Sequence, residues 1–362
     1  GALCERAGDP KRAEAALRDA AAILDKPDVL MEEAPLTRAE INAQAAETYE
    51  RLGRLCLKAG RPDQAVADFR TAQKRDPSRA ARLSYNLAEV LAGQGKDREA
   101  LERLDEYLQT EPLETDGYEL KITLQRKLGR DAAVVPDLEA AGGRDAQNPA
   151  LKMLLAREYA RAGRRADAAN TYLALAKDAP TADIYRKLFD LYQESGRVGA
   201  VLDLLNVDLA AASDKPDKPG DASSAARARA MLQALRGDGD LVKKLLPEAK
   251  QRLTGRPPLA YETRVLLAAL AARTGALDTA EALYRSCLGP DGGVVQGDEQ
   301  EVYFGLLRVL MLAHKYEEVV TVATRGLKNE NTVLAPLYED LALARLALGQ
   351  DADALDASEE AV

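Results

Sequence analysis

The chain has 362 residues, 46% hydrophobic and 30% charged, and leucine and alanine far outnumber β-branched and aromatic residues, which favours an all-helical protein. Its net charge of −9 excludes general attraction to nucleic acid or to an anionic membrane. No apolar run approaches the roughly 20 residues of a membrane helix, and Cys4, Cys56 and Cys287 form no disulfide or metal-ligand pattern. We therefore expect a soluble chain without a cofactor, and its cysteine use leaves the compartment open, with a lean to a reducing, cytoplasmic one.

The first elements of the chain do not follow the spacing of the later ones. Residues 1–24 predict a partial helix-turn-helix unit around Gly8, and residues 25–45 predict an inserted segment followed by the start of a long helix. Thr37 followed by Glu40 is the pattern of a capping box, in which each side chain accepts from the other residue's backbone N–H. We expect this helix to extend to Lys58.

The stretch Leu57 to Pro77 predicts a helix end, a tight turn and a second helix. Gly60 follows basic residues at the end of the first helix, where glycine adopts the left-handed conformation that the turn needs. Pro62 suits the first turn of the next helix, where its missing N–H costs nothing. Phe69 lies on an otherwise small-residue face with helical spacing, and Pro77 ends the helix.

The same pattern recurs along the chain and predicts ten helix-turn-helix units. Its turns fall near Gly8, Gly60, Gly95, Gly129, Gly163, Gly196, Gly237, Gly275, His314 and Gly349. Residues 46–212 form the regular array, and residues 213–224 form a loop rich in proline, serine and aspartate. Residues 225–362 form a second, less regular array with a loop at 289–300. We expect the array to fall into two segments.

With apolar or small residues at fixed distances before and after each turn, the chain resembles the tetratricopeptide-repeat family over nearly its whole length. The family's eight signature positions recur in phase, with the turn glycine at position 15. The resemblance implies a right-handed α-solenoid in which neighbouring units stack. It also implies that the first helices of the pairs line a concave groove, and that the groove binds an extended peptide or a helix.

Positions 2, 5, 9 and 12 of each first helix are expected to face the groove, because the apolar positions 4, 7, 8 and 11 face neighbouring helices. Tyr85 and Phe304 are at position 5 and are candidate anchors for a partner side chain, although an aromatic ring lying flat on the solenoid wall explains each equally well. The candidate partner-binding residues are Arg54, Arg82, Tyr85, Asn86, Glu89, Arg126, Arg157, Arg186, Phe304 and Arg308.

The residues expected on this face predict a groove of two parts. It is partly basic in the early units and more apolar in the later units, where it includes Met231, Val265 and Leu343. Some members of the family hold an acidic C-terminal tail with a carboxylate clamp. Asn86 matches one clamp position, but Glu50 and Asp116 stand where the clamp has lysines. Because those carboxylates repel another carboxylate, the clamp is not supported.

Catalysis is not expected from this sequence. His314 is its single histidine and stands at a turn position that glycine fills in most other units, so we interpret it as a substitute helix cap. No Ser/His/Asp or Cys/His constellation can be assembled around it. Cys56 and Cys287 occupy packing positions and are expected to be buried.

The sequence therefore predicts a scaffold that binds a protein or peptide in the groove and supports assembly of a complex. One alternative is a regulatory or substrate-recruiting arm of a larger enzyme, as in relatives resembling O-linked N-acetylglucosamine transferase. Another is self-association, because the chain begins inside a first helix and stops inside a second one without a polar capping helix. The same feature also suggests a fragment of a longer protein.

Overall fold

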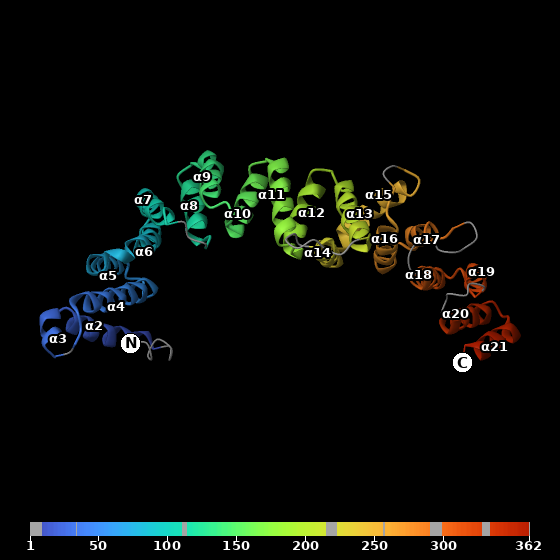
Figure 1. Ribbon diagram of the computed structural model, residues 1–362, viewed down its shortest axis with the longest axis horizontal. Coiled ribbons are helices and arrows are strands. Elements are labelled where there is room, and N and C mark those ends of the chain that lie inside the picture. The colour runs from blue at the N-terminus through green and yellow to red at the C-terminus, as the bar shows by residue number, and fades with distance from the viewer. Residues whose placement is uncertain are drawn as a thin grey trace. The chain divides into compact units, whose positions relative to one another are not determined.

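The computed structural model describes residues 9–33, 35–110, 114–214, 223–255, 258–289, 299–327 and 334–361. Within these ranges the regular structure is helical and contains no β-strand, so the predicted all-α fold is confirmed (Figure 1). The chain divides into two compact units, Gly1–Gly163 and Arg164–Val362. The predicted helix before Gly8 and most of the loops at 213–224 and 289–300 lie outside the described residues, and the segment boundaries proposed from the sequence remain predictions.

The first unit contains successive antiparallel helices joined by short turns. Its helices are α2 (Pro10–Leu24), α3 (Pro27–Glu33), α4 (Arg38–Lys58), α5 (Pro62–Arg75), α6 (Ala80–Gly93), α7 (Asp97–Leu108), α8 (Asp116–Lys127), α9 (Asp131–Arg144) and α10 (Pro149–Arg161), with a 3₁₀ turn, η1 (Pro77–Arg79), before α6.

The second unit continues the same alternation. Its helices are α11 (Arg165–Asp178), α12 (Ala182–Glu194), α13 (Gly199–Asp214), α14 (Ser224–Arg236), α15 (Gly239–Arg252), α16 (Tyr261–Arg273), α17 (Leu277–Arg285), α18 (Glu299–Leu312), α19 (Tyr316–Gly326), α20 (Leu334–Ala347) and α21 (Asp351–Glu360).

The long helix predicted before Lys58 is present as α4. The Thr37 backbone N–H donates to Glu40 Oε2 at 2.8 Å, and the Glu40 backbone N–H donates to Thr37 Oγ1 at 3.3 Å, which completes the capping box. This cap satisfies two of the backbone N–H groups that a helix start leaves without partners. The inserted segment contributes α3, which packs against α4.

Seven turn glycines adopt the left-handed conformation, with φ between 65° and 78°: Gly60, Gly95, Gly129, Gly163, Gly196, Gly275 and Gly349. His314 takes the same conformation, with φ of 57°, and no other non-glycine residue of the described chain has a positive φ. The interpretation of His314 as a helix cap is confirmed, because it occupies a backbone position that side chains rarely tolerate.

Gly237 departs from the predicted turn. Its φ is −86°, and α15 begins two residues later behind Asp238. The Asp238 carboxylate accepts from the backbone N–H of Leu241 at 2.9 Å. A side-chain cap therefore replaces the left-handed glycine at this turn, since it starts the next helix without requiring a positive φ.

Hydrophobic side chains pack between the helices of each pair and between neighbouring pairs. Ala65, Phe69 and Ala72 are fully buried on α5, as their spacing predicts. A Cβ atom at Gly53 of α4 would lie 2.5 Å from the Phe69 ring, so the ring fills the space that glycine leaves. Cys56 and Cys287 are also fully buried, and burial raises the pKa of both thiols.

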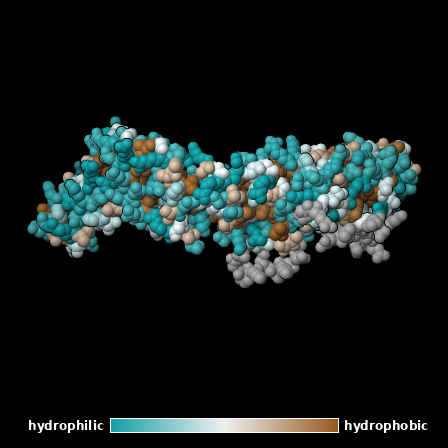
Figure 2. All heavy atoms as spheres, turned by 90° about the horizontal axis from the view of Figure 1, so that it is seen from above, coloured by the Kyte–Doolittle hydropathy of each residue, from teal (hydrophilic) through white to brown (hydrophobic). Residues whose placement is uncertain are grey.

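The exposed surface is mainly hydrophilic, and hydrophobic side chains form small separate patches on the face shown in Figure 2. Of the helices in the described ranges, none combines the length and the apolar character needed to cross a lipid bilayer. The same ranges contain no group of three or more His, Cys, Asp or Glu side chains arranged to hold a metal ion.

Candidate functional site

A buried carboxylate links the first two predicted arginines. Glu50 of α4 is 1% exposed and pairs with Arg54 of the same helix, at 3.0 Å, and with Arg82 of α6. Arg79, next to the start of α6, also pairs with Glu50 at 3.3 Å. The side chains of Arg54 and Arg82 remain 56% and 59% exposed. One carboxylate thus fixes guanidinium groups from two neighbouring first helices.

The same arrangement recurs between α8 and α10. Glu158 of α10 is 3% exposed and pairs with Arg126 of α8 and with Arg157 of its own helix. Arg157 also pairs with Glu119 of α8 at 3.3 Å. Arg126 is 24% exposed and serves mainly to pair with the buried carboxylate, whereas Arg157 is 56% exposed. The basic charge predicted for this face is therefore largely offset by carboxylates.

Tyr85, Asn86 and Glu89 lie together on α6. The ring of Tyr85 is half-buried, with its centroid 5.2 Å from that of Tyr107, and its hydroxyl donates to Glu89 at 3.5 Å. Burial, together with Glu89 and Asp116, raises the pKa of Tyr85 to about 12. Burial also raises the pKa of Glu89. The ring packs on the helical wall, which is the alternative offered by the sequence.

The remaining predicted residues belong to the second unit. Arg186 of α12 lies 3.8 Å from Asp183 of the same helix. On α18, Phe304 is half-buried and Arg308 is exposed.

The apolar face predicted for the later units is only partly present. Met231 and Val265 are 0% and 4% exposed. They belong to the core, because the side chains at these positions turn into the packing between helices. Leu343, by contrast, is 54% exposed.

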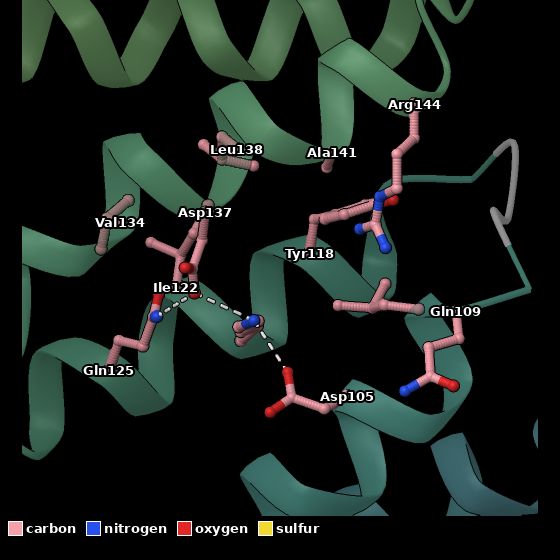
Figure 3. A pocket seen from close by; sticks show the side chains of 12 residues that line it. Asp105, Gln109, Tyr118, Ile122, Gln125, Val134, Asp137, Leu138, Ala141 and Arg144 are labelled. Carbon is pink, nitrogen blue, oxygen red and sulfur yellow. Dashed lines mark hydrogen bonds and ion pairs between the residues drawn. The ribbon is translucent and has the colours of Figure 1, made fainter.

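A hollow of 340 Å³ lies between α7, α8 and α9, and we call it the α8 hollow (Figure 3). The Lys121 ammonium of α8 donates to Asp105 of α7 at 2.8 Å and lies 2.9 Å from Asp137 of α9. The Gln125 amide donates to the same Asp137 carboxylate at 2.7 Å. In Figure 3, a dashed line joins Gln125 to Asp137, and Arg144 extends from α9 towards Tyr118.

Lys121 is satisfied by two carboxylates within the α8 hollow, whereas Arg144, which also lines it, is exposed and forms no ion pair within the described residues. Burial opposes the charge of Lys121, but hydrogen bonds to Asp105 and Asp137 outweigh that effect and raise its pKa. Sequence reasoning missed this site, although a signal was present. Lys121 and Gln125 stand at positions 7 and 11 of their helix-turn-helix repeat, where the repeat pattern predicts apolar residues.

Comparisons with known proteins place the repeat in a family. A family model described as the tetratricopeptide repeat matches residues 50–114. No curated protein sequence matches the chain.

Several solved structures are similar to parts of the chain. YrrB, described as a TPR protein with an unusual peptide-binding site, is 20% identical, covering 46% of this chain and 90% of its own, with a TM-score of 0.33. Yeast Tom70 is 14% identical, covering 94% of this chain and 60% of its own, with a TM-score of 0.37. A thermophilic TPR protein from Thermus thermophilus, TTC0263, is 23% identical, covering 53% of this chain and 100% of its own, with a TM-score of 0.31.

The matched segment contains α5, α6 and α7 with the left-handed turns at Gly60 and Gly95, and helix pairs of the same form follow it in sequence. Such pairs bury their apolar faces by stacking on their neighbours, which leaves long helical surfaces for partners. Residues 50–114 therefore contain tetratricopeptide repeats, a motif found in scaffolds for protein–protein interaction.

Proposed function

We propose that this chain binds a protein segment on the face formed by the first helices α4, α6, α8 and α10, and thereby supports assembly of a complex. The observation that carries the proposal is the repeated use of a buried glutamate, Glu50 or Glu158, to hold arginines from two neighbouring first helices. Tetratricopeptide repeats generally serve as non-enzymatic scaffolds, and the proposal assigns the chain no reaction.

The chemistry of arginine explains why this arrangement suits a protein ligand. A guanidinium group has five N–H donors in a planar fork, and a shared carboxylate cannot accept from all the donors of Arg54 and Arg82. Both side chains are more than half exposed, so the remaining donors can reach backbone carbonyls or acidic side chains of a partner. Because Glu50 already restricts both arginines, binding loses less side-chain entropy.

Neighbouring residues extend the same face. Asn86 and Glu89 supply an amide and a carboxylate on α6, and Arg157 supplies an exposed guanidinium on α10. Tyr85 provides the edge of a ring that already packs on Tyr107. The face therefore offers donors and acceptors in alternation, which suits an extended segment whose backbone has both.

The proposal is tested by charge reversal at the arginines that share Glu50. Proteins captured by the full chain from a lysate of its source are identified, purified and titrated against the chain by isothermal calorimetry. We expect Arg54→Glu together with Arg82→Glu to weaken binding of the segment by at least about tenfold, because a lost charge-assisted contact is worth about 1.5–3 kcal/mol.

The matched control is Arg70→Glu together with Lys74→Glu, which reverses two exposed charges on the second helix α5. This pair changes the net charge of the first unit by the same amount as Arg54→Glu with Arg82→Glu. It is expected to leave the affinity for the purified partner unchanged. Equal affinity of the Arg54/Arg82 variant and the unmodified chain for every purified partner would refute the proposal.

A further inference from the structure

The second unit contains a hollow of 520 Å³ between α11, α12, α13 and the start of α14, which we call the α12 hollow. Its floor consists of Tyr185 and Tyr192 of α12, which are 2% and 6% exposed. Leu173 of α11 and Leu204 of α13 line it and are half-buried. It is therefore an aromatic and aliphatic depression, large enough to admit a bulky side chain.

Apolar surface continues from the lining of this hollow to the outside of the molecule. Val207 of α13 lines the α12 hollow and is 66% exposed, the highest exposure among the large hydrophobic residues of the described chain. A single exposed valine needs no explanation by itself. Beside an open hollow with a tyrosine floor, however, it enlarges the surface that a ligand can cover.

Both carboxylates of the α12 hollow already have cationic partners. Asp208 is 6% exposed and pairs with Arg227 at 2.8 Å, and Asp203 pairs with Arg252 at 2.5 Å. Arg227 belongs to α14 and Arg252 to α15, so the acidic side chains are neutralised by other helices of the second unit.

Two cations at the hollow have no such partner. Lys177 and Arg197 are exposed, and within the described residues neither forms an ion pair with a carboxylate. Arg197 instead lies over the ring of Tyr192, 5.5 Å from its centroid, where the ring attracts the cation and holds it near the floor. The hollow thus combines tyrosine and leucine side chains and one internal ion pair with two cations that have no carboxylate partner among the described residues.

We propose that the α12 hollow binds an acidic segment of a partner protein that inserts one large apolar side chain. The apolar side chain packs on Tyr185 and Tyr192 between Leu173 and Leu204. Acidic residues next to it in the segment meet Lys177 and Arg197. The hollow belongs to the second unit, where the first helix α12 and the second helices α11 and α13 line it, whereas the face proposed above belongs to the first unit.

A protein segment fits this surface better than a free small molecule, because the apolar surface continues past the hollow to Val207 and the two cations come from different elements. Lys177 belongs to α11, whereas Arg197 lies in the turn between α12 and α13. A segment with one anchoring side chain and flanking carboxylates reaches all of these groups at once.

The probe is a random dodecapeptide library displayed on phage and selected on the full chain. Peptides are counter-selected against the variant Ala200→Phe, in which a larger side chain occupies the α12 hollow. Selected peptides are then synthesised, labelled and titrated by fluorescence anisotropy. We expect them to carry an aromatic or aliphatic residue flanked by aspartate or glutamate, and to bind more weakly as salt rises.

Charge reversal separates this site from binding elsewhere. Lys177→Glu together with Arg197→Glu is expected to lower the affinity for the selected peptides by at least about tenfold. The control Lys243→Glu with Lys244→Glu, two exposed residues of α15 in the same unit, is expected to leave affinity unchanged. The proposal is overturned if no peptide survives counter-selection, if the survivors lack acidic or apolar residues, or if the Lys177/Arg197 variant binds them as tightly as the unmodified chain.

Discussion

The α8 hollow and the α12 hollow occupy the same place in the repeat, but their side chains differ in kind. Measured from the turn glycines, Lys121 of α8 corresponds to Leu188 of α12, and Gln125 corresponds to Tyr192. The carboxylates also have aliphatic counterparts, since Asp105 corresponds to Leu173 and Asp137 to Leu204. In the α8 hollow Lys121 bonds two carboxylates across the interior, whereas the equivalent positions of the α12 hollow are aliphatic and aromatic.

The comparison shows how one backbone arrangement serves two purposes. Lys121, Asp105 and Asp137 together carry one positive and two negative charges, so this network offers no attraction to an acidic partner. An apolar hollow with unneutralised cations at its edge attracts an acidic, apolar ligand. The residue at position 7 is central to this difference, because a lysine there requires carboxylates in the neighbouring helices.

The largest expected effect comes from placing that lysine at the equivalent position of α12. Leu188 is fully buried, and the positions of the two carboxylates are held by Leu173 and Leu204. Leu188→Lys therefore places an ammonium group without a partner in the core. We expect it to lower the free energy of local unfolding by about 3–5 kcal/mol, measured by hydrogen exchange of the α12 amides.

Two further variants control this prediction. Leu188→Met keeps an apolar side chain of similar size and is expected to cost less than about 1.5 kcal/mol. Adding Leu173→Asp and Leu204→Asp to the lysine variant supplies both carboxylates and is expected to recover part of the loss. Unchanged exchange in Leu188→Lys would show that position 7 does not control the difference between the hollows.

A smaller effect is expected from the reverse change in the α8 hollow. Lys121→Leu leaves Asp105 and Asp137 without their shared cation. Because their side chains are 56% and 41% exposed, water screens part of the repulsion, and we expect a loss of about 1–2 kcal/mol in the urea-unfolding free energy. Replacing all three charged residues with leucine is expected to restore or exceed the original stability. A triple variant with a lower unfolding free energy than Lys121→Leu would contradict this account.

The same network predicts a pH dependence. The pKa of Lys121 is raised in the folded chain, so its contribution to stability is complete below the unfolded-state pKa of lysine, about 10.4, and is lost as the pH rises through the folded-state value. Urea-unfolding midpoints of the unmodified chain and of Lys121→Leu should therefore converge above that pH. A constant difference between them would exclude the lysine charge as its origin.

Much of the architecture followed from the sequence, because local physical rules determine it. Turn glycines, the Thr37–Glu40 box and small residues at packing positions each act over one or two helical turns. The backbone conformation at Gly237 does not follow from the sequence, because either an aspartate cap or a left-handed glycine can precede the next helix. In the structure the Asp238 cap is formed, and Gly237 has a negative φ.

The sites were less accessible from sequence, since contacts between helices decide them. The sequence predicts Arg82 and Arg126 as cations of the groove, but their pairing with the buried Glu50 and Glu158 depends on the stacking of neighbouring repeats. Met231 and Val265 were assigned to the groove by position, and the packing of the less regular second unit buries them. Lys121 gave a readable signal, because a lysine at an apolar position calls for a partner.

A small effect on stability is expected from Arg197→Gln, which removes the cation above Tyr192. Exposed contacts of this kind are worth about 0.5–1 kcal/mol. Hydrogen exchange of α12 should change by no more than this amount, although the selected acidic peptides lose affinity. A much larger loss of stability would mean that Arg197 is a structural residue rather than part of a binding edge.

The smallest effect is expected from Val207→Ser. A side chain that is 66% exposed contributes little to packing, so unfolding in urea should change by less than about 0.5 kcal/mol. A larger destabilisation would assign Val207 to the core and remove it from the proposed surface.

The central claim is that the α12 hollow, and not its counterpart at α8, receives a partner segment. Photo-cross-linking with p-benzoylphenylalanine in place of Val207, or of the equivalent exposed residue Ala140 of α9, tests this claim directly with one selected acidic peptide. The account predicts a cross-linked product from position 207 that unlabelled peptide suppresses, and none from position 140. Equal yields at the two positions, or a product only at 140, would contradict it.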